Sequence, residues 1–315
     1  MTKFIKKTAL LLGIAILVSF AFVVLDIFVV KNQASQGYNA ALIDKIDRLK
    51  SIQEPKIILV GNSNVAFGFN SEMIEQAFDM PVVNMGLHGG IGDGYYEDII
   101  EPYINEGDIV VLGYSSFDSN EYFPDKGLAL NMLEKNRELW IPVSQSEKIS
   151  LLKAYPYYVY SCFSKFITFS GNKSEGNSYS RDAFNEYGDI TYKPNEVEKY
   201  KGISVWEGTL KIPSAPTDDT AKRINEFNNR VNEKGAILVV TAVPVYYCEY
   251  TPEREQYQNL EKLLNEKLDC DMISSYEDYF LEPEFFYDTV LHLNSGGASK
   301  RTQQFILDLK FYLNS

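Results

Sequence analysis

Short apolar runs alternate with helical patterns along most of this chain, and this alternation restricts the fold more than any other feature. The apolar runs, rich in β-branched residues, lie at 56–60, 80–86, 107–114, 236–244 and 270–275. The helical patterns lie at 70–78, 92–104, 217–235, 252–268 and 294–313. Strands that alternate with helices in this order are typical of a doubly wound parallel sheet with helices on both faces. The sequence therefore predicts an α/β fold.

Three residues with candidate functions follow the first three predicted strands. Ser63, Gly86 and Tyr114 each lie just beyond a strand end. In open parallel sheets the functional crevice is at the carboxyl ends of the strands. We therefore expect these residues to share one crevice.

The first thirty residues predict a membrane segment. Three lysines within the first seven residues precede an apolar run from 8 to 30. About 23 helical residues rise roughly 34 Å, enough to cross the hydrocarbon core of a bilayer. The basic end should stay in the cytoplasm, so we expect 1–31 to be a single-pass signal anchor in the plasma membrane with the rest of the chain exported. The alternative is a cleaved signal peptide, but Asn32 stands where a cleavage site needs a small residue.

Beyond the anchor we expect a stalk helix at 32–55 and one large domain at 56–315. Residues 117–213 break the strand–helix alternation and predict an insertion that folds over the rim of the crevice. This insertion is rich in tyrosine and contains a loop of glycine, serine and asparagine at 170–180. Tyrosines of this kind can stack on sugar rings, but we favour packing with a solvated hydroxyl.

Charge and composition argue against several classes of function. The net charge is −13, with no basic cluster outside the N-terminal tail, so nucleic acid is not an expected partner. Three cysteines form no CxxC pair, and two isolated histidines give no metal site. The sequence does not decide whether Cys248 and Cys270 form a disulfide. The glycine runs match no phosphate-binding motif, and we expect neither a metal nor a cofactor.

The two histidines limit the choice of a catalytic base. A serine hydroxyl is a poor nucleophile until a base takes its proton. His292 follows Asp288 by four residues on a short segment before the last helix, so the carboxylate can fix the imidazole. His88 has no acid close before it and is expected at the rim. The sequence therefore predicts a Ser63–His292–Asp288 triad.

Oxyanion stabilisation requires backbone or amide donors directed at the developing negative charge. The glycines after the second predicted strand let the main chain approach closely, and Gly86, Gly89 and Gly90 are candidates. The amide of Ser63 is a second candidate donor.

The motifs that carry these residues resemble those of the SGNH/GDSL hydrolase superfamily. They are "GNS" at 61–63, "NMG" at 84–86 and "D…HLN..G" at 288–297. The resemblance implies a flavodoxin-like three-layer fold, with Ser63 as nucleophile, His292 as base and Asp288 as its partner. It also implies that Gly86 donates an oxyanion amide.

The anchor and exported domain further resemble the branch with O-acyltransferases of alginate and cell-wall polymers. This implies O-acyl transfer to, or removal from, a cell-surface polysaccharide, beside a multispanning acyltransferase partner.

Two departures from the superfamily pattern favour an alternative, a binding or assembly module that keeps the fold without efficient chemistry. The asparagine of the usual "GxND" block is missing, so Tyr114, Ser115 or Ser116 would have to replace that donor. The acid and base are spaced as DxxxH instead of DxxH.

Overall fold

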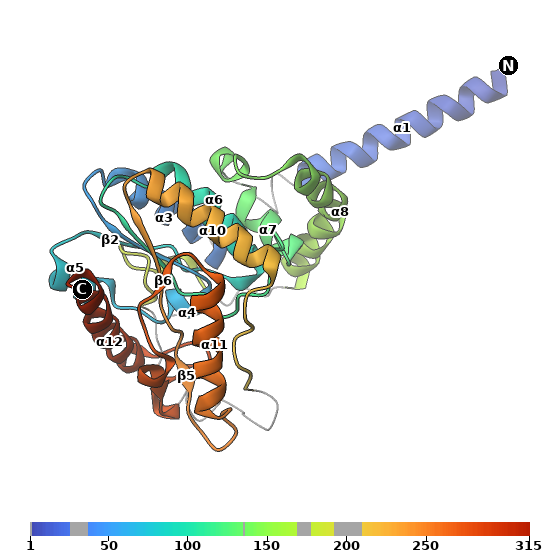
Figure 1. The fold of residues 1–315 in the computed structure, drawn as a ribbon. Helices are drawn as coiled ribbons and strands as arrows, with labels where there is room; N and C mark the ends of the chain where they lie inside the picture. Colours follow the sequence, from blue (N-terminus) through green and yellow to red (C-terminus); the bar gives the residue numbers. More distant parts are fainter. Residues whose placement is uncertain (1, 26–36, 135, 169–177, 192–209) are drawn as a thin grey trace.

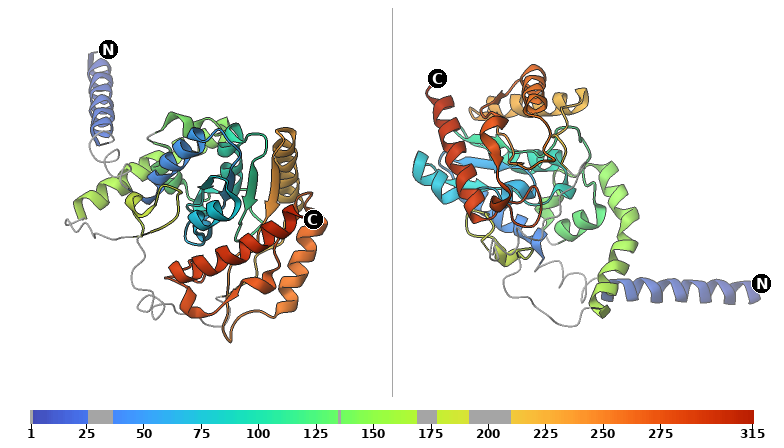
Figure 2. Two further views of the ribbon diagram at one scale, coloured as in Figure 1. Left: turned by 90° about the vertical axis from the view of Figure 1, so that its left-hand side faces the viewer. Right: turned by 90° about the horizontal axis from the view of Figure 1, so that it is seen from below.

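The centre of the molecule is a five-stranded, wholly parallel sheet (Figures 1 and 2). This computed structural model describes residues 2–25, 37–134, 136–168, 178–191 and 210–315. The sheet strands are β1 (Ile57–Val60), β2 (Val82–Asn84), β3 (Ile109–Leu112), β4 (Ile237–Val240) and β6 (Asp271–Met272). Each lies inside a predicted apolar run, so the predicted parallel α/β fold is confirmed.

The strand order β2-β1-β3-β4-β6 determines where a crevice can form. The chain leaves β1 for one edge of the sheet, then returns past β1 to β3 on the other side. In parallel sheets such a reversal opens a crevice at the carboxyl ends of the central strands. Ser63 lies there, three residues beyond the end of β1.

Helices cover both faces of the sheet. The covering helices are α3 (Ala41–Ser51), α6 (Asp93–Ile100), α10 (Asp218–Glu233) and α11 (Arg254–Lys267) on one face, and α5 (Ser71–Phe78) and α12 (Ser295–Leu313) on the other. Side chains alternate along a strand, so Ile58 and Val60 belong to the first core cluster and Ile57 and Leu59 to the second. The result is three layers.

The segment at 38–52 is helical, but it belongs to the domain core and not to a stalk. A short turn at Tyr38–Ala40 leads into α3, which packs against β2. Even Lys45 is buried, because its ammonium donates to the backbone carbonyls of Asn84 and Gly188. An amphipathic pattern indicates that one helix face is covered, and here the sheet covers it.

The insertion is partly described. It contains α7 (Lys126–Leu133) and α8 (Gln145–Thr168), which pack on each other. The glycine-rich loop lies mostly outside the described residues. Among the tyrosines of α8, Tyr158 is buried, whereas Tyr157 and Tyr160 are exposed.

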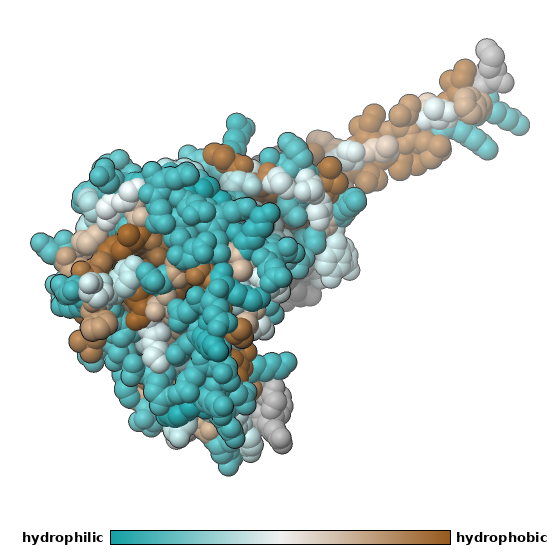
Figure 3. All heavy atoms as spheres, viewed as in Figure 1, coloured by the Kyte–Doolittle hydropathy of each residue, from teal (hydrophilic) through white to brown (hydrophobic). Residues whose placement is uncertain are grey.

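The N-terminal helix α1 (Thr2–Leu25) extends away from the domain (Figures 1 and 2). It is long and apolar enough to cross a membrane, as an anchor or a signal sequence would be. Figure 3 shows its apolar surface against the mostly hydrophilic surface of the domain on the same side. The predicted span continues to residue 30, beyond the last described residue of α1.

Three glycines let the segment after β1 lie close against the strand ends. Gly61, Gly86 and Gly113 follow β1, β2 and β3, and a Cβ on any of them would lie 2.6–2.8 Å from side-chain atoms of Val65. For Gly86 the same Cβ would also lie 2.5 Å from the backbone nitrogen of Ala66. Such contacts are too short for real atoms, so the glycines form a floor for the helical turn that contains Val65.

We predict that Gly86→Ala lowers the free energy of unfolding by about 1–3 kcal/mol, because the added methyl group overpacks a fully buried contact. Gly127→Ala in α7 is the matched control. Its new Cβ would meet only a carboxylate oxygen at 3.4 Å, so the change should stay within about 1 kcal/mol. Urea unfolding of the full chain in detergent measures both, and equal effects would contradict the steric role of Gly86.

Candidate active site

Ser63 is the first residue of a one-turn helix, α4 (Ser63–Ala66), directly after β1. Asn62 caps this turn, since its Oδ1 accepts from the backbone N–H of Asn64 at 3.1 Å. Serine and asparagine suit such a strand-to-helix turn, where side chains satisfy the free N–H groups. The Ser63 side chain is thereby presented, half-buried, at the carboxyl edge of the sheet.

His292 and Asp288 lie on one closed loop before α12. Phe286 pairs with Leu293 as an isolated bridge, and the N–H of Tyr287 donates to the carbonyl of His292 at 2.8 Å. The loop therefore accommodates the four-residue spacing between Asp288 and His292. Its ends stay together, and both functional side chains point to the same side.

The predicted triad residues are within hydrogen-bonding distance of one another. Nε2 of His292 lies 2.8 Å from Oγ of Ser63, and Nδ1 lies 2.8 Å from Oδ1 of Asp288. An ionised carboxylate only accepts hydrogen bonds, so the Nδ1 proton faces Asp288 and the Nε2 lone pair faces the serine hydroxyl. This is the arrangement in which an imidazole can take the serine proton.

Two aromatic side chains that the sequence did not indicate hold the histidine and the aspartate. The buried ring of Phe67 stacks on the His292 imidazole, with 4.3 Å between centroids and 8° between planes. Tyr179 donates its hydroxyl to Oδ2 of Asp288 at 2.5 Å, and the same hydroxyl lies 3.2 Å from Nδ1 of His292. Both carboxylate oxygens therefore have a partner, which fixes the plane of Asp288.

Tyr179 belongs to the insertion, at 178–191, and a buried polar cluster anchors this segment to the sheet. The Asp189 carboxylate accepts from the backbone and hydroxyl of Ser71 and from Nδ2 of Asn84, each at 2.7 Å. The N–H of Ile190 donates to the carbonyl of Ala66 at the end of α4. Through Tyr179 and Ile190 this segment contacts the Asp288 loop and the end of α4.

Gly86 does not present its amide to the site in this structure. Its N–H donates to Oδ1 of Asn84 at 2.9 Å, and both residues are buried. Asparagine side chains commonly turn back to the backbone two residues on. The expected oxyanion donor is thus already paired, and the need for glycine here is steric.

The three candidates for the missing asparagine differ in position. Tyr114 is fully buried and donates to Oε1 of Glu97 at 2.8 Å, away from the triad. Ser116 donates to Asp118 and accepts from the backbone of Ser214. Only Ser115 lies beside the nucleophile turn, where its Oγ accepts from Nδ2 of Asn62 at 2.6 Å.

A buried arginine orients Asn62 through Asn64. Arg301 of α12 is 1% exposed, and its Nη1 donates to the backbone carbonyl of Asn64 at 2.9 Å and lies 3.4 Å from its Oδ1. Asn64 in turn donates through Nδ2 to Oδ1 of Asn62 at 2.7 Å. Burial lowers the pKa of Arg301 to about 10, so the guanidinium stays charged at neutral pH.

Because Oδ1 of Asn62 is occupied in this way, its Nδ2 faces Ser115 and the site. The Nδ2 group carries two hydrogen atoms. One is donated to Oγ of Ser115, and the other has no acceptor within the described part of the chain. The backbone N–H of Ser63 likewise has no acceptor among the described residues. Asn62 could have been identified from the sequence because it adjoins the candidate nucleophile. Arg301 could not, because it lies 238 positions after Ser63 and belongs to no motif.

His88 is exposed at the rim, as expected. Burial of part of its ring lowers its pKa, the charge of Asp125 opposes this, and His292 lowers it further, so the two histidines share one electrostatic environment. No cluster of metal-binding side chains occurs among the described residues. The cysteines at 162, 248 and 270 form no disulfide in the structure.

Comparison of the chain with protein-family models, with curated proteins and with solved structures found no match. What the site does must therefore be argued from its geometry.

We predict that a fluorophosphonate probe labels Ser63 in the full chain in detergent, because the imidazole can take the hydroxyl proton. Ser63→Ala and His292→Ala should both abolish labelling. Ser51→Ala is the matched control and should keep it, since Ser51 is exposed at the end of α3 and bonds only the backbone of Arg48. Labelling that survives Ser63→Ala would contradict an activated Ser63.

We also predict that Tyr179→Phe slows this labelling about tenfold. The substitution keeps the ring but removes a hydrogen bond to a charged carboxylate, and such bonds are typically worth about 1.5–3 kcal/mol. Tyr187→Phe, in the same segment, removes a hydroxyl that bonds Glu75 instead of the triad, and it should leave the rate unchanged. Equal rates for all three proteins would exclude Tyr179 as a positioning residue.

Proposed function

We propose that this protein is a membrane-anchored, extracytoplasmic serine enzyme that transfers acyl groups to, or removes them from, a cell-surface polysaccharide. The observation that carries the proposal is the Ser63–His292–Asp288 hydrogen-bond chain, with 2.8 Å at each step. A hydroxyl held on an imidazole that is itself held on a carboxylate is the arrangement of serine acyl transfer.

The reaction follows from these contacts. Ser63 Oγ attacks the ester carbonyl while Nε2 of His292 takes its proton, and the new Oγ–carbon bond gives a tetrahedral intermediate. Collapse breaks the bond to the leaving oxygen, which receives the proton from His292. A water or sugar hydroxyl then attacks the acyl-serine, with His292 again as base, and restores Ser63.

Two donors are available for the negative oxygen of the intermediate. They are the N–H of Ser63 and the Nδ2 of Asn62, which the Asn64–Arg301 chain directs towards the site. In this assignment Asn62 supplies the side-chain amide that the third motif block lacks. Removing one such donor typically costs about 10²–10³ in turnover.

The motifs and the strand order support placing the chain in the SGNH/GDSL superfamily. Counted among the sheet strands, the order is 2-1-3-4-5, which is the order of flavodoxin-like sheets. The nucleophile follows the first strand, and the base and acid precede the last helix, as in that superfamily's motif order.

Features outside the site support a position at the membrane. The carboxyl end of α1 lies next to α8 (Figure 1), whose side chains Ile149, Leu152 and Tyr160 are more than half exposed. In the proposed topology the basic N-terminus is cytoplasmic and the domain faces a polymer emerging at the outer surface. A tether of this kind favours a transferase, which would receive acyl groups from a multispanning partner.

A second candidate is a non-catalytic module that binds or assembles the modification machinery. The occupied Gly86 amide favours it, since one backbone oxyanion donor of the superfamily is lost. This candidate predicts a Ser63 that no fluorophosphonate labels in the folded domain.

We predict that deleting the gene changes the O-acetyl content of envelope polysaccharides and that a Ser63→Ala strain reproduces the change. Loss of one triad member typically costs on the order of 10⁴–10⁶ in turnover. NMR of the purified polysaccharides measures the content: a loss indicates a transferase and a gain indicates an esterase.

A strain with Ser51→Ala serves as the control for protein level and should match the wild type, because Ser51 is exposed at the end of α3 and its hydroxyl bonds only the backbone of Arg48. An unchanged content in both the deletion and the Ser63→Ala strain would contradict the enzyme proposal. A change in the deletion alone would favour the non-catalytic module.

A further inference from the structure

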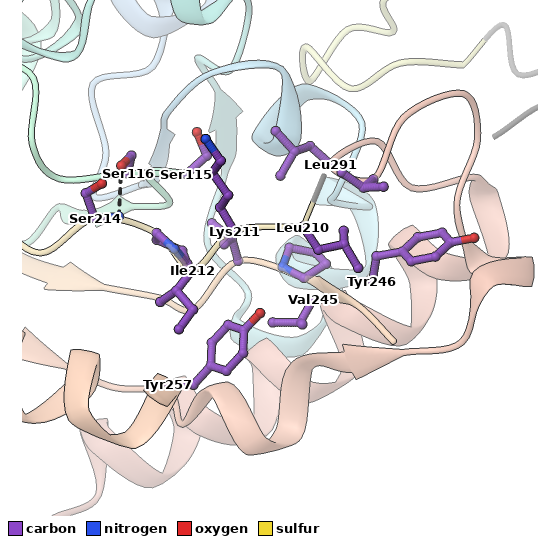
Figure 4. A pocket seen from close by; sticks show the side chains of 14 residues that line it. Ser115, Ser116, Leu210, Lys211, Ile212, Ser214, Val245, Tyr246, Tyr257 and Leu291 are labelled. Atoms are coloured by element: carbon purple, nitrogen blue, oxygen red, sulfur yellow. Dashed lines mark hydrogen bonds between the residues drawn. The ribbon is translucent and has the colours of Figure 1, made fainter. Parts of the chain in front are cut away.

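A cavity of about 280 Å³ begins beside the triad and is not used by the chemistry described above. Two residues connect it to the site. Ser115, which bonds Asn62, lines one end, and Leu291, the neighbour of His292, lines the same cavity (Figure 4). The short strand β5 (Val245–Tyr246), paired with β7 (Phe280–Leu281), and the segment 210–214 form other walls.

The size of the cavity exceeds what an acetyl group needs. A water molecule occupies about 30 Å³ of liquid, so this volume corresponds to roughly nine water-sized atoms. An acetyl group has three non-hydrogen atoms. A ligand that fills the cavity is therefore a longer chain.

The lining selects an acyl chain over a sugar ring. Aliphatic side chains dominate it, among them Ile212, Val243, Val245 and Val290. A sugar buried against such walls would lose the hydration of its hydroxyls without new partners, which costs several kcal/mol. An alkyl chain gains about 0.8 kcal/mol for each buried CH₂.

One polar group in the cavity has no hydrogen-bond partner among the described residues. Tyr257 of α11 is only 3% exposed, and Figure 4 shows its hydroxyl directed into the pocket. This hydroxyl makes no hydrogen bond to any residue in the described part of the chain. Burial raises the pKa of Tyr257 to about 12, so the phenol keeps its proton at neutral pH and can donate it in a hydrogen bond.

A cation lies at the same cavity. The side chain of Lys211 extends along the pocket towards the end where Ser115 lies (Figure 4). No described carboxylate forms an ion pair with it, although the chain as a whole carries a net charge of −13.

We propose that this cavity binds the acyl group of the donor, and that the group is a chain of several carbons with a hydrogen-bond-accepting oxygen that Tyr257 holds. The oxygen belongs to a hydroxyl or to a carboxylate, and Lys211 favours the carboxylate. The inference rests on the proposed serine acyl chemistry and adds the class of acyl group.

The test compares p-nitrophenyl esters of acetate, hexanoate, ω-hydroxyhexanoate and adipate with the full chain in detergent. Each turnover forms acyl-Ser63, releases nitrophenol, and then consumes one water. The wild type should show a kcat/KM about tenfold higher for each oxygenated chain than for hexanoate, because the Tyr257 hydroxyl gains a hydrogen-bond acceptor that hexanoate does not supply. Tyr257→Phe should abolish this preference and bring both oxygenated esters to the rate of hexanoate.

Two further variants make the assignment specific. Tyr247→Phe removes a phenol hydroxyl from an exposed residue that does not line the cavity, and it should keep the preference. Lys211→Met should slow only the adipate ester if the natural group is a carboxylate. If it slows neither oxygenated ester, the natural group is a hydroxyl.

Failure of this inference is distinguishable from failure of the proposed function. Turnover that needs Ser63 but shows no preference for oxygenated chains, or is fastest with acetate, overturns the acyl-pocket assignment alone. No Ser63-dependent turnover of any ester overturns the proposed function and this inference with it.

Discussion

The hydrogen bond between Nε2 of His292 and Oγ of Ser63 connects two residues that are 229 positions apart, and the organisation of the site depends on it. It requires the turn after β1 and the loop before α12 to meet at one edge of the sheet. Glycines beneath the first segment and the closed Phe286–Leu293 loop in the second satisfy that requirement. Phe67 and Tyr179 then restrict the imidazole and the carboxylate to one orientation.

The buried positive charge of Arg301 orients the polar side chains beside this hydrogen bond. Arg301 is buried, and no described carboxylate forms an ion pair with it, so its charge acts through Asn64 on Asn62. Buried cations are costly unless hydrogen-bonded, and the carbonyl of Asn64 meets part of that cost. The arrangement fixes the Asn62 side chain with its Nδ2 facing Ser115, beside the turn that carries Ser63.

Much of this architecture could be predicted from the sequence, because apolar runs and helix patterns report local burial. The five sheet strands were found in this way, whereas Ser63, His292 and Asp288 were chosen from the scarcity of histidines and from the motifs around them. The packing of α3 against the sheet was not predicted, because a periodic pattern indicates that one helix face is covered but not what covers it. The hydrogen bond from the Gly86 amide to Asn84 was not predicted, because the sequence pattern does not report how the Asn84 side chain is oriented. Tyr179 is 109 residues from Asp288, and only the folded chain brings them together.

The most direct test of the account is detection of the acyl-serine itself. The full chain would be mixed with p-nitrophenyl hexanoate, quenched in acid within the first turnovers, digested, and analysed by mass spectrometry. The account predicts a hexanoyl adduct on the peptide that contains Ser63. A His292→Ala variant should form no adduct, because acylation of Ser63 needs His292 as the base. An adduct on another residue, or none in a folded chain that turns the ester over, would contradict it.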